Sequence, residues 1–204
     1  MDRPWVIVLN SGSMPGLVAT AAAAEKPFLA GLYVHEGRPA DTWYHQSFLS
    51  QVERFSVRRP LELDLPQLSV RPERAASLAL RWPQLLMAAA AAALEIKAER
   101  LVWPVQVGED SDAIARVTQL VLLVQQTVEV EAGRDLRIDT PLVELTDKQL
   151  VEMGHQMDLP WELSRSCVSD TAQPCGSCGG CLERRKAFAQ AGIADPGQLV
   201  AIPQ

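Results

Sequence analysis

Four cysteines near the end of the chain constrain its fold more than any other feature. The 204-residue sequence has no cysteines besides Cys167, Cys175, Cys178 and Cys181, and the last three are spaced C-x2-C-x2-C. Four thiolates can hold one zinc ion in a tetrahedron, at about 2.3 Å from each sulfur. Three glycines in the same run give the turns backbone freedom: Gly176, Gly179 and Gly180. The spacing therefore predicts a structural zinc site, closed to water and substrate.

Two alternatives to zinc remain open from the cysteines alone. The first is a disulfide pair or buried thiols, although nothing else in the sequence indicates an oxidising compartment. The second is an iron–sulfur cluster, which would make the segment an electron-transfer site. The ferredoxin run places its fourth cysteine closely downstream and before a proline. In this chain the fourth cysteine, Cys167, lies upstream across a seven-residue gap, which favours zinc.

The composition is that of an ordinary globular protein, with 48% hydrophobic and 22% charged residues. A net charge of −6 argues against a nucleic-acid partner. The longest apolar run, Leu85 to Leu94, is about half a membrane span, and the N-terminal apolar run is too short for a signal peptide. We expect a cytoplasmic protein without membrane contact. We also expect an α/β domain over 1–160, with the zinc-binding segment and last helix (161–204) packed on it.

Apolar runs alternate with helical patterns along most of the chain. The continuous run Trp5 to Leu9 is typical of a buried parallel strand. Further strands are predicted at 29–34, 61–65 and 101–107, with a short extended segment at 136–142. Helices are predicted after Gly16 and at 41–55, 84–98, 147–157 and 182–191, and another begins at a cap of Ser111 or Asp112. Thr146 is expected to cap the helix at 147, and Gly192 to end the last one. This alternation predicts a doubly wound parallel sheet.

The loop after the first strand is the candidate nucleotide site. It reads N-S-G-S-M-P-G over 10–16 and leads directly into a helix. Such a loop offers backbone N–H groups and the positive end of a helix dipole to a phosphate, although an ordinary strand-to-helix turn has the same composition. The candidate residues are Asn10, Ser11, Gly12, Ser13, Met14 and Gly16.

Two of the remaining polar positions lie where α/β sheets place ligand sites. His35 and Glu36 follow the second strand, at its carboxyl end. No partner is visible for either in the sequence, so we expect both to be solvated loop residues. His155, near the end of the 147–157 helix, is expected on the surface.

The last third of the chain resembles the 7-cyano-7-deazaguanine synthases, the queuosine-precursor branch of the PP-loop ATP pyrophosphatases. That family has a serine–cysteine pair, C-G-x-C-x-x-C, a helix with an arginine and a G/A-F pair, and then A-G-I-x-D-P. The matching residues are Ser166-Cys167, Cys175-Gly176, Cys178, Cys181, Arg184, Ala187-Phe188, Ala191-Gly192-Ile193 and Asp195-Pro196; Thr140-Pro141-Leu142, Asp147-Lys148 and Leu65-Pro66 also resemble family positions. The resemblance implies a PP-loop fold of the adenine-nucleotide α-hydrolase type over nearly the whole chain.

The pyrophosphate loop departs from the family pattern. The family reads S-G-G-x-D-S, where this chain has Ser11-Gly12-Ser13-Met14-Pro15-Gly16. Proline has neither the charge to hold magnesium nor an N–H to donate to phosphate. The family's P-G-R-N is reduced to Trp82-Pro83-Gln84, and its S-G-Y-P-D region is replaced by residues 103–110.

Two interpretations follow from the resemblance. An intact member would use ATP and magnesium to convert 7-carboxy-7-deazaguanine, with ammonia, to the nitrile. The altered loop favours a second interpretation, a catalytically inactive paralogue that binds a protein partner or a small nucleotide or deazapurine. Asp110, Asp112 and Glu36 are candidates to replace the lost carboxylate, and the substitutions Ser13→Gly, Pro15→Asp and Gly16→Ser are predicted to restore Mg-ATP affinity. Family membership also implies a homodimer.

Overall fold

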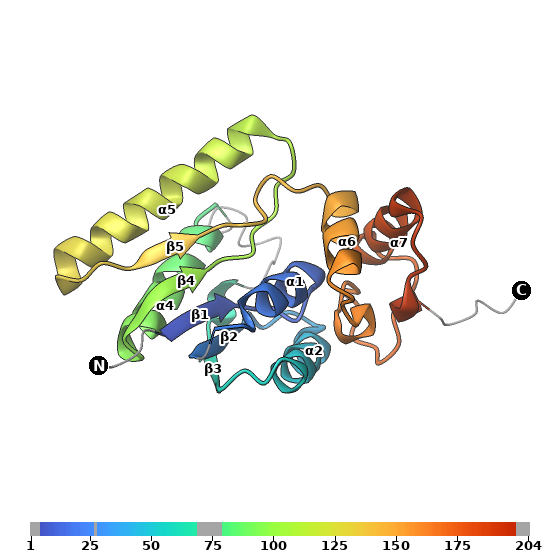
Figure 1. Cartoon of the computed structure of the whole chain (residues 1–204), viewed down its shortest axis with the longest axis horizontal. Helices are drawn as coiled ribbons and strands as arrows, with labels where there is room; N and C mark the ends of the chain where they lie inside the picture. Colours follow the sequence, from blue (N-terminus) through green and yellow to red (C-terminus); the bar gives the residue numbers. More distant parts are fainter. Residues whose placement is uncertain (1–4, 27, 69–78, 199–204) are drawn as a thin grey trace, which may run out of the picture.

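The computed structural model describes residues 5–26, 28–68 and 79–198. In these ranges the chain forms one parallel sheet in the order β3-β2-β1-β4-β5 (Figure 1). The chain winds outward from β1 to β3, then crosses back to the other side of β1 for β4 and β5. The sheet is therefore doubly wound, as predicted. The strands are β1 (Trp5–Leu9), β2 (Leu29–His35), β3 (Arg59–Asp64), β4 (Ala98–Val102) and β5 (Arg137–Asp139).

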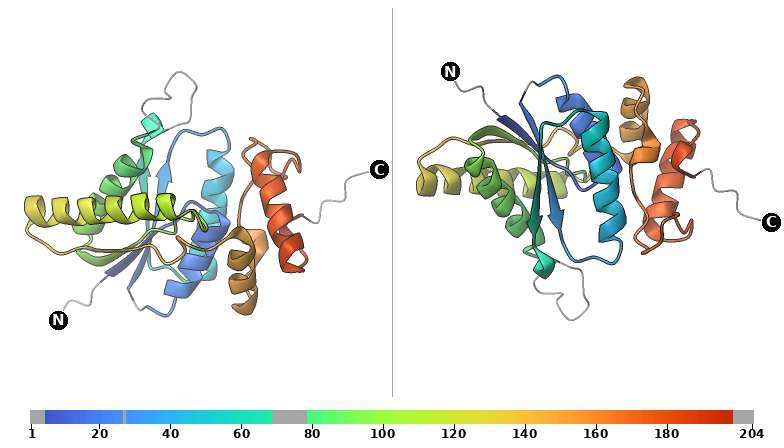
Figure 2. Two further views of the ribbon diagram at one scale, coloured as in Figure 1. Left: turned by 90° about the horizontal axis from the view of Figure 1, so that it is seen from above. Right: turned by 90° about the horizontal axis from the view of Figure 1, so that it is seen from below.

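Helices cover both faces of the sheet and extend beyond one end of it. Figure 1 shows α6 and α7 beside each other at the end nearest α1 and α2, and the views of Figure 2 agree. None of the helices in the described part of the chain is both long enough and apolar enough to span a bilayer. The α-helices are α1 (Met14–Ala23), α2 (Asp41–Arg54), α4 (Arg81–Glu95), α5 (Ser111–Ala132), α6 (Asp147–Gln156) and α7 (Gly179–Ala191), and the 3-10 turns are η1 (Pro66–Leu68), η3 (Trp161–Leu163) and η4 (Pro196–Gln198).

One core lies between the sheet and the helices α4 and α5. Ile7 and Leu9 of β1 point to this face and are buried, because alternate residues of a strand face opposite sides. The alanine-rich helix α4 packs against them through Leu86 and its small neighbours, which allow close approach to the sheet. The opposite side of α4 faces solvent, where Met87 is 38% exposed.

The other core joins the sheet to the C-terminal segment. Val8 of β1 and Leu17 of α1 belong to this core. They pack in one cluster with Leu150 of α6, Trp161 of η3 and Phe188 of α7. Gly154 lets the Trp161 ring approach closely, since a Cβ there would lie 2.2 Å from a ring carbon. The cysteine-rich segment is thus connected to the sheet through apolar packing as well as through the chain.

Several element boundaries differ from the sequence prediction, each for a local reason. The fourth strand is Ala98–Val102 instead of 101–107, because Pro104 has no N–H to continue the ladder. The helix α5 is capped by Asp110, which accepts a hydrogen bond from the Ala113 N–H at 3.0 Å, so neither predicted cap is correct. Thr146 forms a capping box with Gln149, and Gly192 ends α7 with a left-handed φ of 68°, both as predicted.

The packing of α4 predicts a large difference between neighbouring substitutions. Leu86 is 0% exposed, so Leu86→Ala should lower the free energy of unfolding by about 2–5 kcal/mol through lost burial and a cavity. Met87→Ala, one residue further on the outer face, should change it by less than about 0.5 kcal/mol. Urea unfolding followed by circular dichroism measures both. Equal losses would contradict the described orientation of α4.

Candidate functional site

The loop between β1 and α1 is held by the buried side chain of Asn10, which is 1% exposed. Its Nδ2 donates to Thr20 Oγ1 at 2.9 Å and to Gln51 Oε1 at 2.8 Å. Its Oδ1 accepts from the Gly12 N–H at 2.8 Å. The amide therefore fixes the loop to α1 and α2 at the carboxyl end of β1, where the strand order reverses and doubly wound sheets bind ligands.

Hydrogen bonds also join this loop to the C-terminal segment. Gln51 Nε2 donates to the carbonyl oxygens of Gly12 (3.2 Å) and Leu163 (2.9 Å). The Arg165 N–H donates to the same Gly12 oxygen at 2.9 Å. Gly12 has a φ of 73°, and a Cβ there would lie 2.1 Å from the Tyr44 carbonyl oxygen, so only glycine fits. The loop, α2 and the segment after 160 form one connected network.

The first turn of α1 has fewer anion-binding groups than a glycine-rich loop provides. Ser13 precedes the helix without capping it through its side chain, and its hydroxyl accepts from Ser11 Oγ at 2.9 Å. Pro15 lies in the first turn and has no N–H. Gly16 packs directly against Asn10, because a Cβ at residue 16 would lie 2.1 Å from Asn10 Oδ1.

A cavity of about 170 Å³ opens beside the loop, at the switch point between β1 and β4. Glu36 in this cavity is 6% exposed and accepts from Arg81 Nε (3.2 Å) and Nη2 (2.5 Å). The expectation that Glu36 is a solvated loop residue is therefore wrong. We call this space the switch-point cavity; it is lined by Ser11, Ser13, Glu36, Arg38, Arg81 and Trp103, among others.

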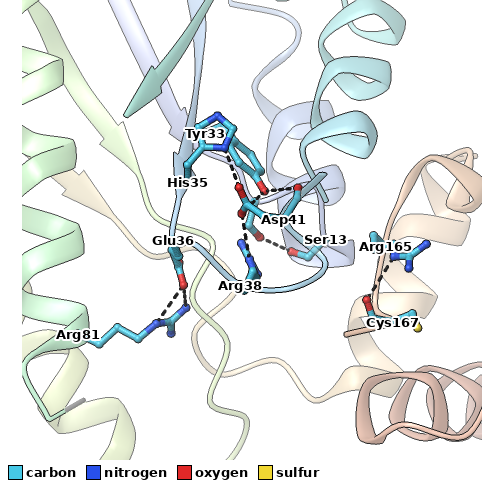
Figure 3. A network of polar contacts seen from close by, with 10 residues as sticks. Ser13, Tyr33, His35, Glu36, Arg38, Asp41, Arg81, Arg165 and Cys167 are labelled. Atoms are coloured by element: carbon cyan, nitrogen blue, oxygen red, sulfur yellow. Dashed lines mark hydrogen bonds and ion pairs between the residues drawn. The ribbon is translucent and has the colours of Figure 1, made fainter. Parts of the chain in front are cut away.

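Arg38 brings a second guanidinium group to the switch-point cavity. It lies over the Tyr44 ring, 4.4 Å from the centroid, and its Nε is 3.6 Å from Asp41 Oδ1. Figure 3 shows it beside Ser13, with Glu36 and Arg81 directed toward each other. Its Nε and Nη2 are buried, with no hydrogen-bond partner among the described residues. Sequence reasoning missed both arginines, although Arg38 closely follows the carboxyl end of β2.

The four cysteines meet as predicted, with their sulfurs within 4.8 Å of one another. The Sγ atoms of Cys178 and Cys167 are 3.9 Å apart. Sulfurs about 2.3 Å from one zinc ion in a tetrahedron are about 3.8 Å apart, so the donor set and spacing fit zinc. All four cysteines lie in the described part of the chain, and no disulfide joins them.

The pKa values of two of the thiols are shifted in opposite directions by their surroundings. A hydrogen bond from Ser169, helped by the N–H groups of Ser177 and Cys178, lowers the pKa of Cys175 to about 5. Burial raises the pKa of Cys181 to about 12. A divalent ion would stabilise the thiolate of both. Gly176 makes the turn with a φ of 72°, and Gly180 admits the Ser166 carbonyl oxygen, 2.0 Å from where its Cβ would lie.

A buried arginine organises the end of the segment. Arg184 donates from Nε and Nη2 to the two carboxylate oxygens of Asp195, at 2.7 and 2.8 Å. Its other bonds reach the carbonyl oxygens of Ser164 and Trp161 and the hydroxyl oxygen of Ser164. Both charged side chains are less than one-tenth exposed. Arg184 of α7 and Asp195 therefore form one buried ion pair, and each needs the other to be buried without an unpaired charge.

The predicted residues thus fall into two groups. Asn10 to Gly16 line or support the switch-point cavity, and the cysteines lie in the segment that Arg165 connects to this loop. A second cavity, of about 320 Å³, lies between them and is lined by Ser13, Pro15, Arg165 and Ser166, among others. Asp110 caps α5 and Asp112 is exposed on it, so neither lines the switch-point cavity.

Comparisons with known proteins identify the family of the chain. The family model described as queuosine biosynthesis protein QueC matches residues 65–192. The 7-cyano-7-deazaguanine synthase of Chlorobaculum parvum is 29% identical over 223 aligned residues, 97% of either chain. That of Chloroherpeton thalassium is 29% identical over 215 residues, 93% of this chain and 94% of the relative. The solved NMN synthetase from Francisella tularensis matches 100% of this chain and 90% of its own, with a TM-score of 0.50 and 14% identity, which indicates a similar fold alone.

The five-stranded parallel sheet defines a doubly wound α/β protein, a fold that the solved NMN synthetase shares. Within that class, it belongs to the queuosine biosynthesis protein QueC family, because the family model spans more than half of its residues. The resemblance noted from the sequence is confirmed.

The cysteine cluster predicts that Cys178→Ser releases zinc and destabilises the segment. A serine oxygen is a poorer zinc ligand than a thiolate, so the metal content should fall from about one equivalent to well below it. The melting temperature should fall with it. Val168→Ala, at an exposed position next to Cys167, should keep the zinc. Elemental analysis of the purified proteins measures this, and unchanged metal in the Cys178 variant would refute the site.

Arg184→Met is predicted to destabilise the chain by about 3–5 kcal/mol, because it leaves the Asp195 carboxylate buried and unpaired. Lys186→Met, on the exposed side of the same helix, should cost less than about 0.5 kcal/mol. Adding Asp195→Asn to the Arg184 variant should recover part of the loss. Urea unfolding of wild type and the three variants measures these differences. If the double variant is no more stable than Arg184→Met, the lost stability comes from packing and not from the unpaired carboxylate.

Proposed function

We propose that this chain is a 7-cyano-7-deazaguanine synthase-like protein whose ATP-dependent activation of the substrate is weak or lost. The family assignment and the two relatives aligned over 97% and 93% of the chain support a synthase-like framework. In this framework the ATP site is the loop Asn10–Gly16, and the deazapurine site lies beside it. The cysteine segment supplies a structural zinc ion that takes no part in the reaction.

The observation that carries the proposal is the packing of Asn10 against Gly16. The Asn10 oxygen occupies the space that a side chain at residue 16 would need, with a Cβ contact of 2.1 Å. The family's final loop serine therefore has no room here. The loop is repacked around Asn10, and its altered residues fit one another.

Magnesium binding is weakened by the same repacking. Pro15 stands where the family has the metal-holding aspartate. Of the three acidic residues considered as substitutes, Glu36 alone lines the switch-point cavity. Its carboxylate is paired with Arg81 at 2.5 Å, which competes with a metal ion for the same oxygen. Magnesium stabilises the developing charge of the transition state, so its loss lowers the rate more than it lowers substrate binding.

Nucleotide or other anion binding is retained in part under this proposal. Arg38 and Arg81 bring positive charge to the switch-point cavity. Ser13, the N-cap of α1, lines the same cavity, so the positive end of the helix dipole is available to a bound anion. A second candidate follows from the same features: a catalytically inactive, zinc-stabilised paralogue that acts as a binding or regulatory protein. The two differ in whether any pyrophosphate is released.

The direct test is calorimetric titration of Mg-ATP into zinc-loaded protein, followed by pyrophosphate release with 7-carboxy-7-deazaguanine and ammonia. Weak binding with slow release would support the weakened synthase. Binding without release would favour the paralogue. Turnover at the rate of the Chlorobaculum parvum enzyme, measured in parallel, would overturn the proposal.

The loop itself gives a sharper prediction. The double substitution Ser13→Gly and Pro15→Asp should strengthen Mg-ATP binding by about tenfold, because a charged interaction with the metal and one backbone N–H are regained. Pro15→Asn returns the N–H without the charge, so it should gain less and show little magnesium dependence. Titration with and without magnesium separates these contributions.

The triple substitution suggested by sequence alone is predicted to behave differently. Adding Gly16→Ser to the double variant places a Cβ against Asn10, so it should lower the melting temperature and lose the affinity gain. Thermal unfolding of the double and triple variants tests the Asn10 packing. Equal stability and affinity would show that residue 16 has room for a side chain.

A further inference from the structure

A second group of potential metal ligands lies outside the switch-point cavity, around the edge strand β3. His35 ends β2, His45 lies on α2 and Glu62 lies in β3. His35 Nε2 is 3.1 Å from Glu62 Oε2, and His45 Nε2 is 2.9 Å from Glu62 Oε1. One ligand atom from each of the three residues lies within 4.8 Å of the others. Three consecutive elements, β2, α2 and β3, thus bring two imidazoles and one carboxylate together.

The hydrogen bonding around His35 orients its ring. Its Nδ1 lies 2.7 Å from Asp41 Oδ2, and Asp41 Oδ1 accepts from the Tyr33 hydroxyl at 3.0 Å. Figure 3 shows His35 and Tyr33 both directed toward Asp41. A carboxylate that accepts from the distal N–H of a histidine is the usual support for a metal-binding imidazole, because it fixes the tautomer and raises the basicity of the other nitrogen.

The contact between His35 and Glu62 requires a positive charge between the two groups, because both ring nitrogens of His35 face carboxylate oxygens. If Asp41 accepts from Nδ1 of a neutral His35, the Nε2 atom carries a lone pair, and it faces a carboxylate oxygen. Two electron-rich atoms at 3.1 Å repel each other unless a proton or a cation lies between them. At His45 a neutral imidazole with its proton on Nε2 can donate to the other oxygen of Glu62. The arrangement is therefore satisfied by one additional proton, on His35, or by one metal ion shared by the three side chains.

The cluster is both supported and accessible. The Tyr33 ring packs against His35 and His45, with centroids 4.9 and 5.0 Å away, so both imidazoles are held from one side. The side chains of His35, His45 and Glu62 are 26%, 24% and 45% exposed. An ion can enter from solvent, and three protein ligands leave at least one position for water.

We propose that His35, His45 and Glu62 bind a divalent transition-metal ion of the zinc type, at a site separate from the four cysteines. Imidazole and carboxylate ligands favour zinc over magnesium, which prefers oxygen donors alone. The bound ion links α2 to β2 and β3. Helix α2 also carries Gln51, which hydrogen-bonds Asn10 and Gly12 of the loop after β1. The ion therefore stabilises the position of α2 beside that loop. The assignment does not depend on ATP binding or catalysis.

The experiment uses protein that already holds zinc at its cysteines. Wild type is titrated with zinc by calorimetry and, separately, with cobalt followed by absorption spectroscopy. The variants His45→Gln and Glu62→Gln each remove one ligand. The matched control is His155→Gln, which changes the third histidine of the chain, exposed on α6. Circular dichroism and thermal unfolding without added metal establish that each variant is folded.

The expected result is an additional metal equivalent in wild type and in the control, and its loss in both ligand variants. Added zinc should raise the melting temperature of wild type and the control only. Cobalt in this site should lack the intense thiolate charge-transfer absorption of a cysteine site. Asp41→Asn should weaken the additional site by about 10–100-fold, as loss of outer-shell support does elsewhere.

Three outcomes would overturn the proposal. One is the absence of an additional equivalent in wild type up to millimolar zinc, which would leave a proton as the bridging charge. Another is an additional equivalent that persists in both His45→Gln and Glu62→Gln. The third is a thiolate spectrum for the additional cobalt, which would assign it to the cysteines. If His45→Gln does not fold, Glu62→Gln alone decides, because glutamine preserves the shape at an exposed position.

Discussion

The buried amide of Asn10 is the interaction on which the rest of the structure depends. It joins β1, α1 and α2 through Thr20, Gly12 and Gln51, all at the point where the sheet reverses its strand order. A buried amide with all its groups paired is specific, because each lost partner leaves a costly unsatisfied group. The same network reaches Leu163 through Gln51, so the position of the C-terminal segment is coupled to the loop.

The C-terminal segment is stabilised by three kinds of interaction that act at different places. Apolar contacts of Trp161 and Phe188 attach it to the face of the sheet that α1 covers. Arg165 donates to four carbonyl oxygens of residues 167–172 and shapes the loop that carries Cys167. The cysteines then provide a donor set for zinc at its exposed end. A small segment with little core of its own gains most from a metal ion.

The chain combines family features that have different physical roles. The parts that build the fold, including the paired Arg184 and Asp195, are present and form a complete set of contacts. The loop at Asn10–Gly16, which the sequence resemblance suggested as the pyrophosphate site, has residues that pack well together around Asn10. A loop can lose its ligand-binding groups without loss of stability when its new side chains satisfy one another. This supports the proposal of weak or absent catalysis on a well-formed framework.

The sequence alone determined the doubly wound sheet, the family and the cysteine cluster, because strand and helix periodicity and ligand spacing are local along the chain. It missed Arg38, Arg81 and the cluster of His35, His45 and Glu62, and it placed Glu36 in solvent. The histidine–glutamate cluster forms only after α2 and β3 pack beside β2, and Arg81, at the start of α4, reaches Glu36 only in the folded chain. Nothing in the spacing of these residues indicates their contacts. Tertiary structure also decides that residue 16 has no room for a side chain. The Asn10 side chain fills that space because its hydrogen bonds to Thr20 and Gln51 orient it.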